Sequence, residues 1–342
     1  MNPILNKSIK KVRRAPRLFV IIFLIVMAFC AVIYGQLGAV TSDEGKDKMF
    51  LVEYGSTPGQ IANSLAEKGF IKNVRAFILY ARITGNIKNF KAGEYIINPA
   101  LNVPQIVDKL IKGEIISITF TIPEGYDLRQ IVKVLVKNDI ATEEEFWEAV
   151  KNGDFDYSFL KDLPHNDNRL EGYLFPDTYT IAKGISVDQV INMMLKRFEN
   201  IYKKLPENKT GLSQHEVVTL ASMIEGESLL DKERAVVASV FFNRLKIGMK
   251  LDSCATVQYA LKERKTRLLF EDLEIKSPYN TYLNKGLPPG PIGNPGIASL
   301  CAALEPVDTN YYYFFAKKDN SGEHVFSTTL GEHNRSKKLG GY

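Results

Sequence analysis

The most restrictive feature of this sequence is an uncharged stretch of 23 residues, Leu18 to Val40. As a helix it would reach about 35 Å, which is long enough to cross a bilayer. Six basic residues precede it and no acidic residue occurs before Asp43, a bias that keeps the N-terminus in the cytoplasm. A cleaved signal peptide is the alternative, but its apolar core usually has only about 7–15 residues, and no clear cleavage site follows. We therefore expect a basic cytoplasmic tail at 1–17, a single transmembrane helix at 18–40 and an exported remainder.

The positive charge of the chain is concentrated in that tail. The whole sequence holds 44 Lys and Arg against 39 Asp and Glu, a net charge of +5. Without the six basic residues of the tail, 38 positive residues face 39 negative ones, so the remainder carries −1. The exported part therefore lacks the basic excess by which proteins bind nucleic acid.

The cysteine and histidine patterns give no indication of a metal site. The four His are scattered at positions 165, 215, 324 and 333, and neither a C-x-x-C nor an H-E-x-x-H motif occurs. We therefore expect neither a metal nor a cofactor. Cys30 lies in the apolar stretch, whereas Cys254 and Cys301 could pair as a disulfide or remain two small buried thiols.

A short unit recurs three times in the first half of the exported part. Each copy is typical of a strand, a turn and a short amphipathic helix, with the strands at 49–54, 93–97 and 118–122. Pro58 and Pro104 fall where the first helical turn of two copies is expected. Further helices are expected at 143–150, which holds the only Trp, at 187–202, and from Asp231 to near Gly248. Together with two paired strands near 311–316 and 324–329, this order predicts an α+β fold.

The stretch Leu220 to Ser228 holds the strongest candidate for chemistry. Ser213 and Glu216 form a capping box, and apolar residues follow at the spacing of one buried helical face. Glu225 continues that face, so the pattern draws a carboxyl group towards an apolar wall, where burial favours the neutral acid that protonates a bridging oxygen. The alternative is a helix-end carboxylate satisfied by a cap or an Arg. Glu227 projects to nearly the opposite side unless the helix ends at Gly226.

Four further stretches accompany this helix: Leu170–Tyr179, Leu251–Tyr259, Ser277–Tyr282 and Gly286–Gly296. The first combines aromatic and acidic side chains, which suits a sugar because its faces stack on rings and its hydroxyls need acceptors. It could equally be a buried turn held by its own tyrosines. The Pro- and Gly-rich last stretch excludes helix and central strand. It is either a flexible linker or a rigid wall of a groove.

Together these stretches resemble the MltG-type (YceG-like) endolytic murein transglycosylases. The matching residues are 171–179, 220–228, 238–245, 277–282 and 286–296, several separated motifs in the right order. The segment from Val52 to Leu65 also resembles the LysM glycan-binding module, although a purely structural role is possible. The resemblance implies a linker at 41–48, a small LysM-like α+β subdomain at 49–116 and a larger mixed α+β catalytic domain at 117–342, behind the single transmembrane helix.

The resemblance also implies an activity. In this family the glutamate at the position of Glu225 is the catalytic acid, and Glu227 matches the second glutamate of the motif, as a supporting or second carboxylate. The implied reaction cleaves the β-1,4 bond from N-acetylmuramic acid to N-acetylglucosamine within peptidoglycan strands, outside the cytoplasmic membrane (periplasmic in a Gram-negative cell), beside membrane-bound glycan polymerases and with a role in ending strand elongation. The chain departs from the expected pattern at Cys254, where an acidic residue is expected, so no second carboxylate is assigned there.

One carboxyl group suffices for a lytic transglycosylase, whereas hydrolysis normally needs two. Polar groups must orient the N-acetyl substituent and aromatic walls must exclude water. The substrate-binding candidates are Glu171, Tyr173, Phe175, Asp177, Gln258, Tyr259, Asn280 and Tyr282. Two alternatives stay open: a two-carboxylate glycan hydrolase (muramidase), with Asp177, Asp252 or Glu227 as partner of Glu225, and a glycan-binding module without catalysis.

Overall fold

The computed structural model describes residues 20, 21, 23–25, 27, 31, 32, 34–41, 46–261 and 265–341. The predicted cytoplasmic tail, Cys30 and part of the predicted transmembrane stretch lie outside them. Among the described residues, no helix combines the length and the apolar character needed to cross a membrane. The chain divides into two compact units, the first formed by residues up to Ile118 with Ala182–Ile185, the second by Thr119–Ile181 and Ser186–Tyr342.

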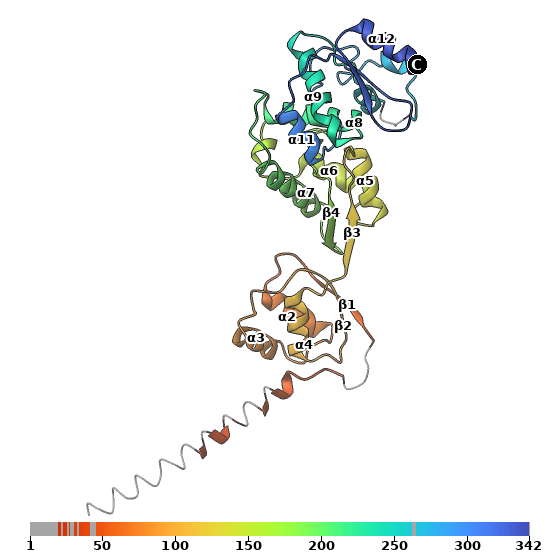
Figure 1. Ribbon diagram of the computed structural model, residues 1–342. Helices are drawn as coiled ribbons and strands as arrows, with labels where there is room; N and C mark the ends of the chain where they lie inside the picture. The colour runs from red at the N-terminus through yellow and green to blue at the C-terminus, as the bar shows by residue number, and fades with distance from the viewer. Residues whose placement is uncertain are drawn as a thin grey trace, which may run out of the picture. The chain divides into compact units, whose positions relative to one another are not determined.

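The first unit packs three short helices on a two-stranded antiparallel sheet (Figure 1). Its elements are β1 (Lys48–Val52), α2 (Pro58–Glu67), α3 (Val74–Ile83), β2 (Gly93–Ile97) and α4 (Val103–Lys112). Thr57 caps α2 and Asn102 caps α4, each in a full capping box. Pro58 is the first residue of α2, and Pro104 is the second residue of α4. Phe50, Leu65 and Tyr95 are fully buried in its core. The order β1, α2, α3, β2 is compatible with the LysM-like assignment, which stays a prediction.

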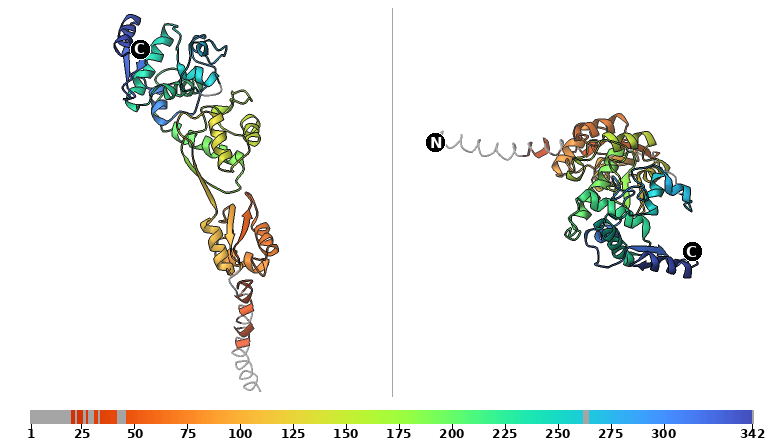
Figure 2. Two further views of the ribbon diagram at one scale, coloured as in Figure 1. Left: turned by 90° about the vertical axis from the view of Figure 1, so that its right-hand side faces the viewer. Right: turned by 90° about the horizontal axis from the view of Figure 1, so that it is seen from above.

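The second unit holds the remaining elements. They are β3 (Ser117–Thr121, which begins in the first unit), α5 (Leu128–Lys137), α6 (Glu143–Asn152), η1 (Ser158–Leu160), β4 (Thr178–Ala182), α7 (Val187–Tyr202), α8 (Gln214–Glu227), α9 (Asp231–Lys246), α10 (Cys254–Ala260), η2 (Phe270–Glu274), α11 (Ile297–Leu304), β5 (Tyr313–Ala316), β6 (His324–Ser327) and α12 (Leu330–Leu339). The strands form two separate pairs, β3 with β4 and β5 with β6. The β5–β6 pair and α12, blue in Figures 1 and 2, pack against each other at the C-terminal end of this unit.

Helix α8 forms the centre of the second unit. Every residue from Val217 to Ile224 is buried, because this part of α8 is mostly apolar and packs against both α9 and α11 (Figure 1). Its two hydroxyl groups, on Thr219 and Ser222, donate to carbonyls of the helix itself. A helix that is apolar all round is stable only inside a protein. Its C-terminal turn, with Glu225 and Glu227, is therefore held by a rigid core.

Several sequence predictions are confirmed in this unit. The Ser213–Glu216 capping box begins α8, and α7 has the predicted bounds 187–202. The segment 286–296 forms neither helix nor strand, and most of it is buried, which favours the rigid wall over the flexible linker. For the two cysteines the sequence left a disulfide or two buried thiols open; both are free thiols, but Cys254 is exposed and Cys301 is partly exposed.

Candidate active site

Glu225 lies at the C-terminal end of α8 with its side chain only 7% exposed. The surroundings are less apolar than the helix pattern predicts. Oε1 lies 2.8 Å from Nη1 of Arg234 on α9, and Oε2 accepts a hydrogen bond of 3.0 Å from the backbone N–H of Gly296. The Arg partner named in the alternative interpretation is therefore present, and the functional interpretation needs support from the space around Glu225.

Arg234 is itself held by several groups. Its side chain is 6% exposed, its Nε donates to Asp231 at 2.9 Å, and Nη1 also contacts the Ser299 hydroxyl at the start of α11. Burial lowers the pKa of Arg234, but the charges of Glu225 and Asp231 outweigh it and raise the pKa overall. Arg234 is therefore a fixed positive charge against Glu225.

A second carboxyl group, that of Glu124, lies against Gly296, whose N–H bonds to Glu225; the sequence did not predict it. Glu124 lies in the turn between β3 and α5, and its carboxyl group packs so closely on Gly296 that a side chain there would collide with it. Burial, and then the charge of Glu225, raise the pKa of Glu124, although Arg234 opposes this. The turn is fixed because Gly125 N–H donates to Asn294 O at 2.8 Å and Asn294 N–H donates to Tyr126 O at 2.9 Å. A lone Glu in a turn gives no sequence signal of this convergence.

Glu227 serves a different neighbour. Helix α8 continues through Gly226, so the two glutamates diverge as helix geometry predicts. Glu227 Oε1 accepts hydrogen bonds from the Ser253 hydroxyl at 2.5 Å and from Ala255 N–H at 3.1 Å. These contacts tie the first turn of α10 to the end of α8. Glu227 therefore positions α10.

A cavity of about 320 Å³ lies beside Glu225. Two glycines beside Glu225 contribute to the lining. Gly226 follows Glu225 in α8, and Gly125 lies against the Glu225 side chain. The lining residues are Gly125, Asp127, Ser222, Gly226, Cys254, Ala255, Gln258, Tyr259, Lys265 and Ile292. Two of the predicted substrate-binding residues, Gln258 and Tyr259, thus line the same cavity as Gly226, which follows the candidate acid in the chain.

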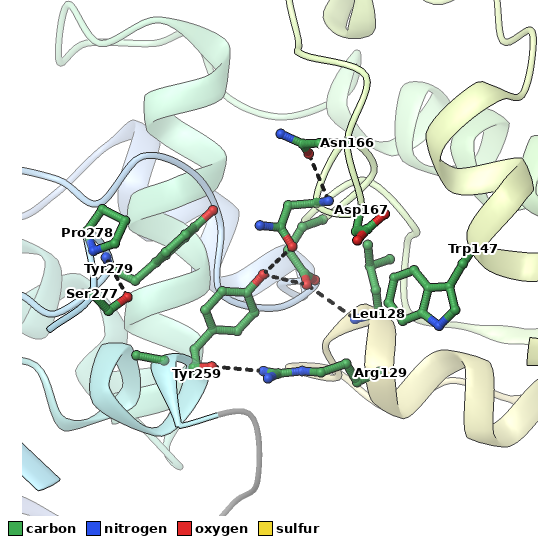
Figure 3. Close-up of a pocket in the computed structure, with 12 residues that line it drawn as sticks. Leu128, Arg129, Trp147, Asn166, Asp167, Tyr259, Ser277, Pro278 and Tyr279 are labelled. Atoms are coloured by element: carbon green, nitrogen blue, oxygen red, sulfur yellow. Dashed lines mark hydrogen bonds between the residues drawn. The ribbon is translucent and has the colours of Figure 1, made fainter. Parts of the chain in front are cut away.

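A larger cavity of about 820 Å³ shares Tyr259 with the first one (Figure 3). It lies between the α5–α6 side of the unit and the segment 277–279. Tyr259 is held between them, since its hydroxyl lies 3.1 Å from Glu171 Oε2 and the Arg129 guanidinium stacks on its ring at 4.8 Å. Arg129 also donates to the Tyr259 carbonyl at 3.1 Å.

Glu171 links three segments behind this cavity. It is 2% exposed, and it accepts hydrogen bonds from Leu128 N–H at 3.3 Å and from the Asn294 amide at 3.4 Å, besides its contact with Tyr259. Burial, and then the charge of Asp127, raise the pKa of Glu171 to about 8. It lines the cavity edge, but its contacts are mainly structural.

The other predicted substrate-binding residues are not part of the lining of either cavity. Tyr173 is buried with its hydroxyl 2.9 Å from His215 Nδ1, and Phe175 is buried beneath Arg197. Asp177 pairs with Arg197 at 2.7 Å. Asn280 is fully buried and donates to the Leu273 and Ile275 carbonyls, whereas the Tyr282 hydroxyl lies 3.2 Å from Cys254 Sγ. The structure thus places Glu171, Gln258 and Tyr259 at the cavities and gives the other five partners within the protein.

The described residues contain no group of three or more His, Cys, Asp or Glu that could hold a metal ion. The groups that the structure places at Glu225 are the carboxyl group of Glu124, the guanidinium of Arg234 and the backbone N–H of Gly296.

Comparisons with known proteins agree with the resemblance seen in the sequence. Residues 50–339 match the model of the YceG-like family. A Bacillus subtilis protein named endolytic murein transglycosylase is 38% identical over 331 aligned residues, which cover 90% of this chain and 89% of that protein. A Streptococcus pneumoniae protein of the same name is 29% identical over 356 residues, covering 93% of this chain and 64% of the longer relative. The crystal structure of a yceG-like protein from Listeria monocytogenes matches with a TM-score of 0.58 and 37% identity over 86% of this chain and all of the other. Because the family model matches most of the sequence, this chain belongs to the YceG-like family.

Proposed function

We propose that this protein is an endolytic lytic transglycosylase of peptidoglycan. It cleaves the β-1,4 bond from N-acetylmuramic acid to N-acetylglucosamine within glycan strands and leaves a 1,6-anhydro end. The observation that carries the proposal is Glu225, a 7% exposed carboxyl group at the end of a core helix whose neighbours line a cavity. The names of the relatives, endolytic murein transglycosylases, support it.

The proposed reaction uses one carboxyl group twice. Protonated Glu225 donates its proton to the bridging oxygen as the bond from that oxygen to C1 of the muramoyl sugar breaks. The resulting carboxylate accepts the proton of the C6 hydroxyl as its oxygen bonds to C1, which restores the acid without water. Arg234 and the Gly296 N–H contact the carboxylate oxygens. Both groups stabilise the negative charge that develops on Glu225 as its proton is transferred. Stabilisation of charge that develops in the transition state accelerates the reaction.

A two-carboxylate hydrolase is the second candidate, and Glu124 is the observation that favours it. The carboxylates predicted for that role have other partners: Asp177 pairs with Arg197 at 2.7 Å, Asp252 lies 3.3 Å from Arg244, and Glu227 bonds to α10. Glu124, by contrast, meets Glu225 at Gly296. Two facing carboxyl groups about 5–9.5 Å apart are the usual requirement of glycoside hydrolysis.

Mass spectrometry of the released fragments separates these candidates. The transglycosylase yields 1,6-anhydromuramic ends, one water lighter than hydrolytic ends. Glu225→Gln keeps the shape of the side chain but removes the transferable proton, so we expect the rate to fall about 10²–10⁴-fold. Glu227→Gln should cost less, because Glu227 holds α10. Mainly hydrated ends, together with loss of activity in Glu124→Gln, would replace the transglycosylase by the hydrolase. If Glu225→Gln leaves the activity unchanged, glycan binding without catalysis by Glu225 is the remaining candidate function.

We propose further that the protein is anchored in the cytoplasmic membrane by Leu18–Val40, with the catalytic part outside and membrane-bound glycan polymerases as neighbours, where cleavage ends the elongation of new strands. The uncharged stretch and the basic residues before it support the anchor. The first unit is proposed to be LysM-like and to bind glycan, on the strength of its β1, α2, α3, β2 order. In the second unit, Glu225→Gln removes the candidate acid and Trp147→Ala removes an aromatic ring from the lining of the larger cavity. The double variant should then still sediment with insoluble peptidoglycan through its first unit, and its recovery in the supernatant would count against this role.

A further inference from the structure

The larger cavity has no task in the chemistry assigned to Glu225. Its volume of about 820 Å³ exceeds that of the cavity beside Glu225, about 320 Å³, and the two meet at Tyr259. An enzyme that cuts within a strand has to hold sugars on both sides of the broken bond. The question is whether the lining of the larger cavity suits sugar, peptide or phosphate.

Three aromatic rings line this cavity. Figure 3 shows Trp147 on one side and Tyr259 and Tyr279 on the other. The two tyrosine rings lie 4.9 Å apart between their centroids. Trp147 is half-buried, its Nε1 donates a long hydrogen bond of 3.4 Å to Glu143, and its ring packs edge-on against Phe146 at 5.3 Å. Partly exposed rings on facing walls are suited to the apolar faces of sugar rings.

The charged groups in the lining are compensated. Arg129 pairs with Asp127 at 2.8 Å, and Asp167 pairs with Lys151 at 3.1 Å. The pKa of Glu171 is raised to about 8 by burial, so this group is mostly protonated at neutral pH. The described residues of this lining therefore offer no unpaired charge to the phosphate of a lipid carrier or to the ionised groups of a stem peptide.

Neutral hydrogen-bonding groups remain at the rim. They are the side chains of Asn166, Asn168 and Ser277. Asn168 Oδ1 lies 3.3 Å from the Tyr259 hydroxyl, which connects the rim to the ring that both cavities share. Amides and hydroxyls of this kind donate to and accept from sugar hydroxyls and N-acetyl groups.

From this combination we infer that the larger cavity is a distal glycan subsite, which binds N-acetylated hexosamine units of the strand remote from the bond that Glu225 cleaves. The inference rests on the proposed function. Binding there gives the enzyme a preference for long strands, because sugars far from the reacting atoms contribute to holding the strand across Glu225.

Trp147 makes this subsite directly observable, because it is the only Trp of the chain. Its fluorescence reports occupancy of the cavity without any need for turnover. The experiment titrates the full-length Glu225→Gln protein with peptide-free N-acetylglucosamine–N-acetylmuramic acid oligomers of two, four and eight sugars. We expect a saturable change in intensity or emission maximum, with affinity that rises with length. In a Tyr279→Ala background the octasaccharide should bind about tenfold more weakly, which corresponds to about 1.4 kcal/mol.

Kinetics of the active enzyme supply the second readout. Trp147→Ala should raise KM for long strands about tenfold, leave kcat nearly unchanged, and have little effect on the shortest substrate that is cleaved. Phe270→Ala is the matched control, because Phe270 is 91% exposed and outside both cavities. It should leave both constants unchanged.

The possible outcomes separate the subsite from the proposed function. No fluorescence change at saturating octasaccharide, in a protein whose wild-type form still releases anhydro ends, would overturn the subsite and leave the function standing. A fluorescence change caused by the free stem peptide, and not by bare sugars, would overturn the assignment to glycan. Loss of the anhydro products themselves would remove the function, whatever Trp147 reports.

Discussion

At the scale of single residues, the sequence located Glu171 near a cavity but gave sugar binding more weight than the contacts of Glu171 within the protein. The aromatic and acidic loop predicted a carboxylate that accepts sugar hydroxyls, and the structure places Glu171 at the edge of the larger cavity. The side chain is 2% exposed, however, and it holds α5, Tyr259 and Asn294 together. The sequence could not show this, because these partners lie 43, 88 and 123 positions away.

This burial predicts a pH-dependent stability. The pKa of Glu171 is raised from its usual 4.5 to about 8 in the folded protein. The native state therefore binds this proton more tightly than the unfolded chain does. The resulting stabilisation is complete below about pH 4.5 and is lost as the pH rises through about 8, an effect of a few kcal/mol. In Glu171→Gln, which stays neutral, the melting temperature should fall less between pH 5 and 9 than in the wild type.

Thermal unfolding of the full chain across this pH range measures the difference. Glu144→Gln, at an exposed position of α6, is the control for removing a carboxylate and should follow the wild-type curve. Wild-type and Glu171→Gln curves that stay parallel from pH 5 to pH 9 would contradict the buried, protonated state of Glu171.

At the scale of elements, the junction of α8 with α10 depends on Gly226. The capping box and the apolar spacing correctly predicted where α8 begins, because both are local patterns. The sequence also allowed the helix to end at Gly226, whereas α8 continues through it and uses the missing side chain for close packing. A Cβ at Gly226 would lie 2.7 Å from Cβ of Ala255 on α10. Such packing between segments is not encoded in any local pattern.

Gly226→Ala should therefore push α10 away from α8 and disturb the contacts of Glu227 with Ser253 and Ala255. We expect a net loss of about 1–2 kcal/mol, since overpacking costs about 1–3 kcal/mol and replacing a helical Gly returns up to about 1. Activity should fall with stability. Chemical denaturation measures the free energy of unfolding. The control is Gly331→Ala in α12, where the nearest atom to the new Cβ is 4.0 Å away, and it should be neutral or stabilising. Equal effects of both substitutions would show that the α8–α10 contact is not tight.

At the scale of the whole molecule, the sequence predicted the local units and missed their convergence. The strand and helix repeats, the β5–β6 pair and the irregular segment 286–296 follow from periodicity, caps and Pro or Gly positions. The site does not, because the Gly296 N–H reaches Glu225 across 71 positions and Glu124 arrives from before α5. Neither contact has a sequence signature, so the second carboxyl group and the distal cavity emerged only from the folded chain.

The last prediction concerns the placement of the molecule in the cell. An uncharged stretch of 23 residues is long enough to span the bilayer, whereas a basic tail bound to the membrane surface is released when salt screens its charges. The full chain should therefore stay in the membrane fraction after high-salt and carbonate washes, and protease added from outside should digest residues beyond Val40. A variant in which Lys7, Lys10 and Lys11 are replaced by Gln keeps the stretch and weakens only surface binding, so it should stay in the membrane as well. Proximity labelling in the same membranes should enrich glycan polymerases over an unrelated single-span protein, and absence of that enrichment would leave the enzyme anchored but remove the proposed partners. Recovery of a soluble, N-terminally trimmed protein would instead show that the stretch is a cleaved signal peptide.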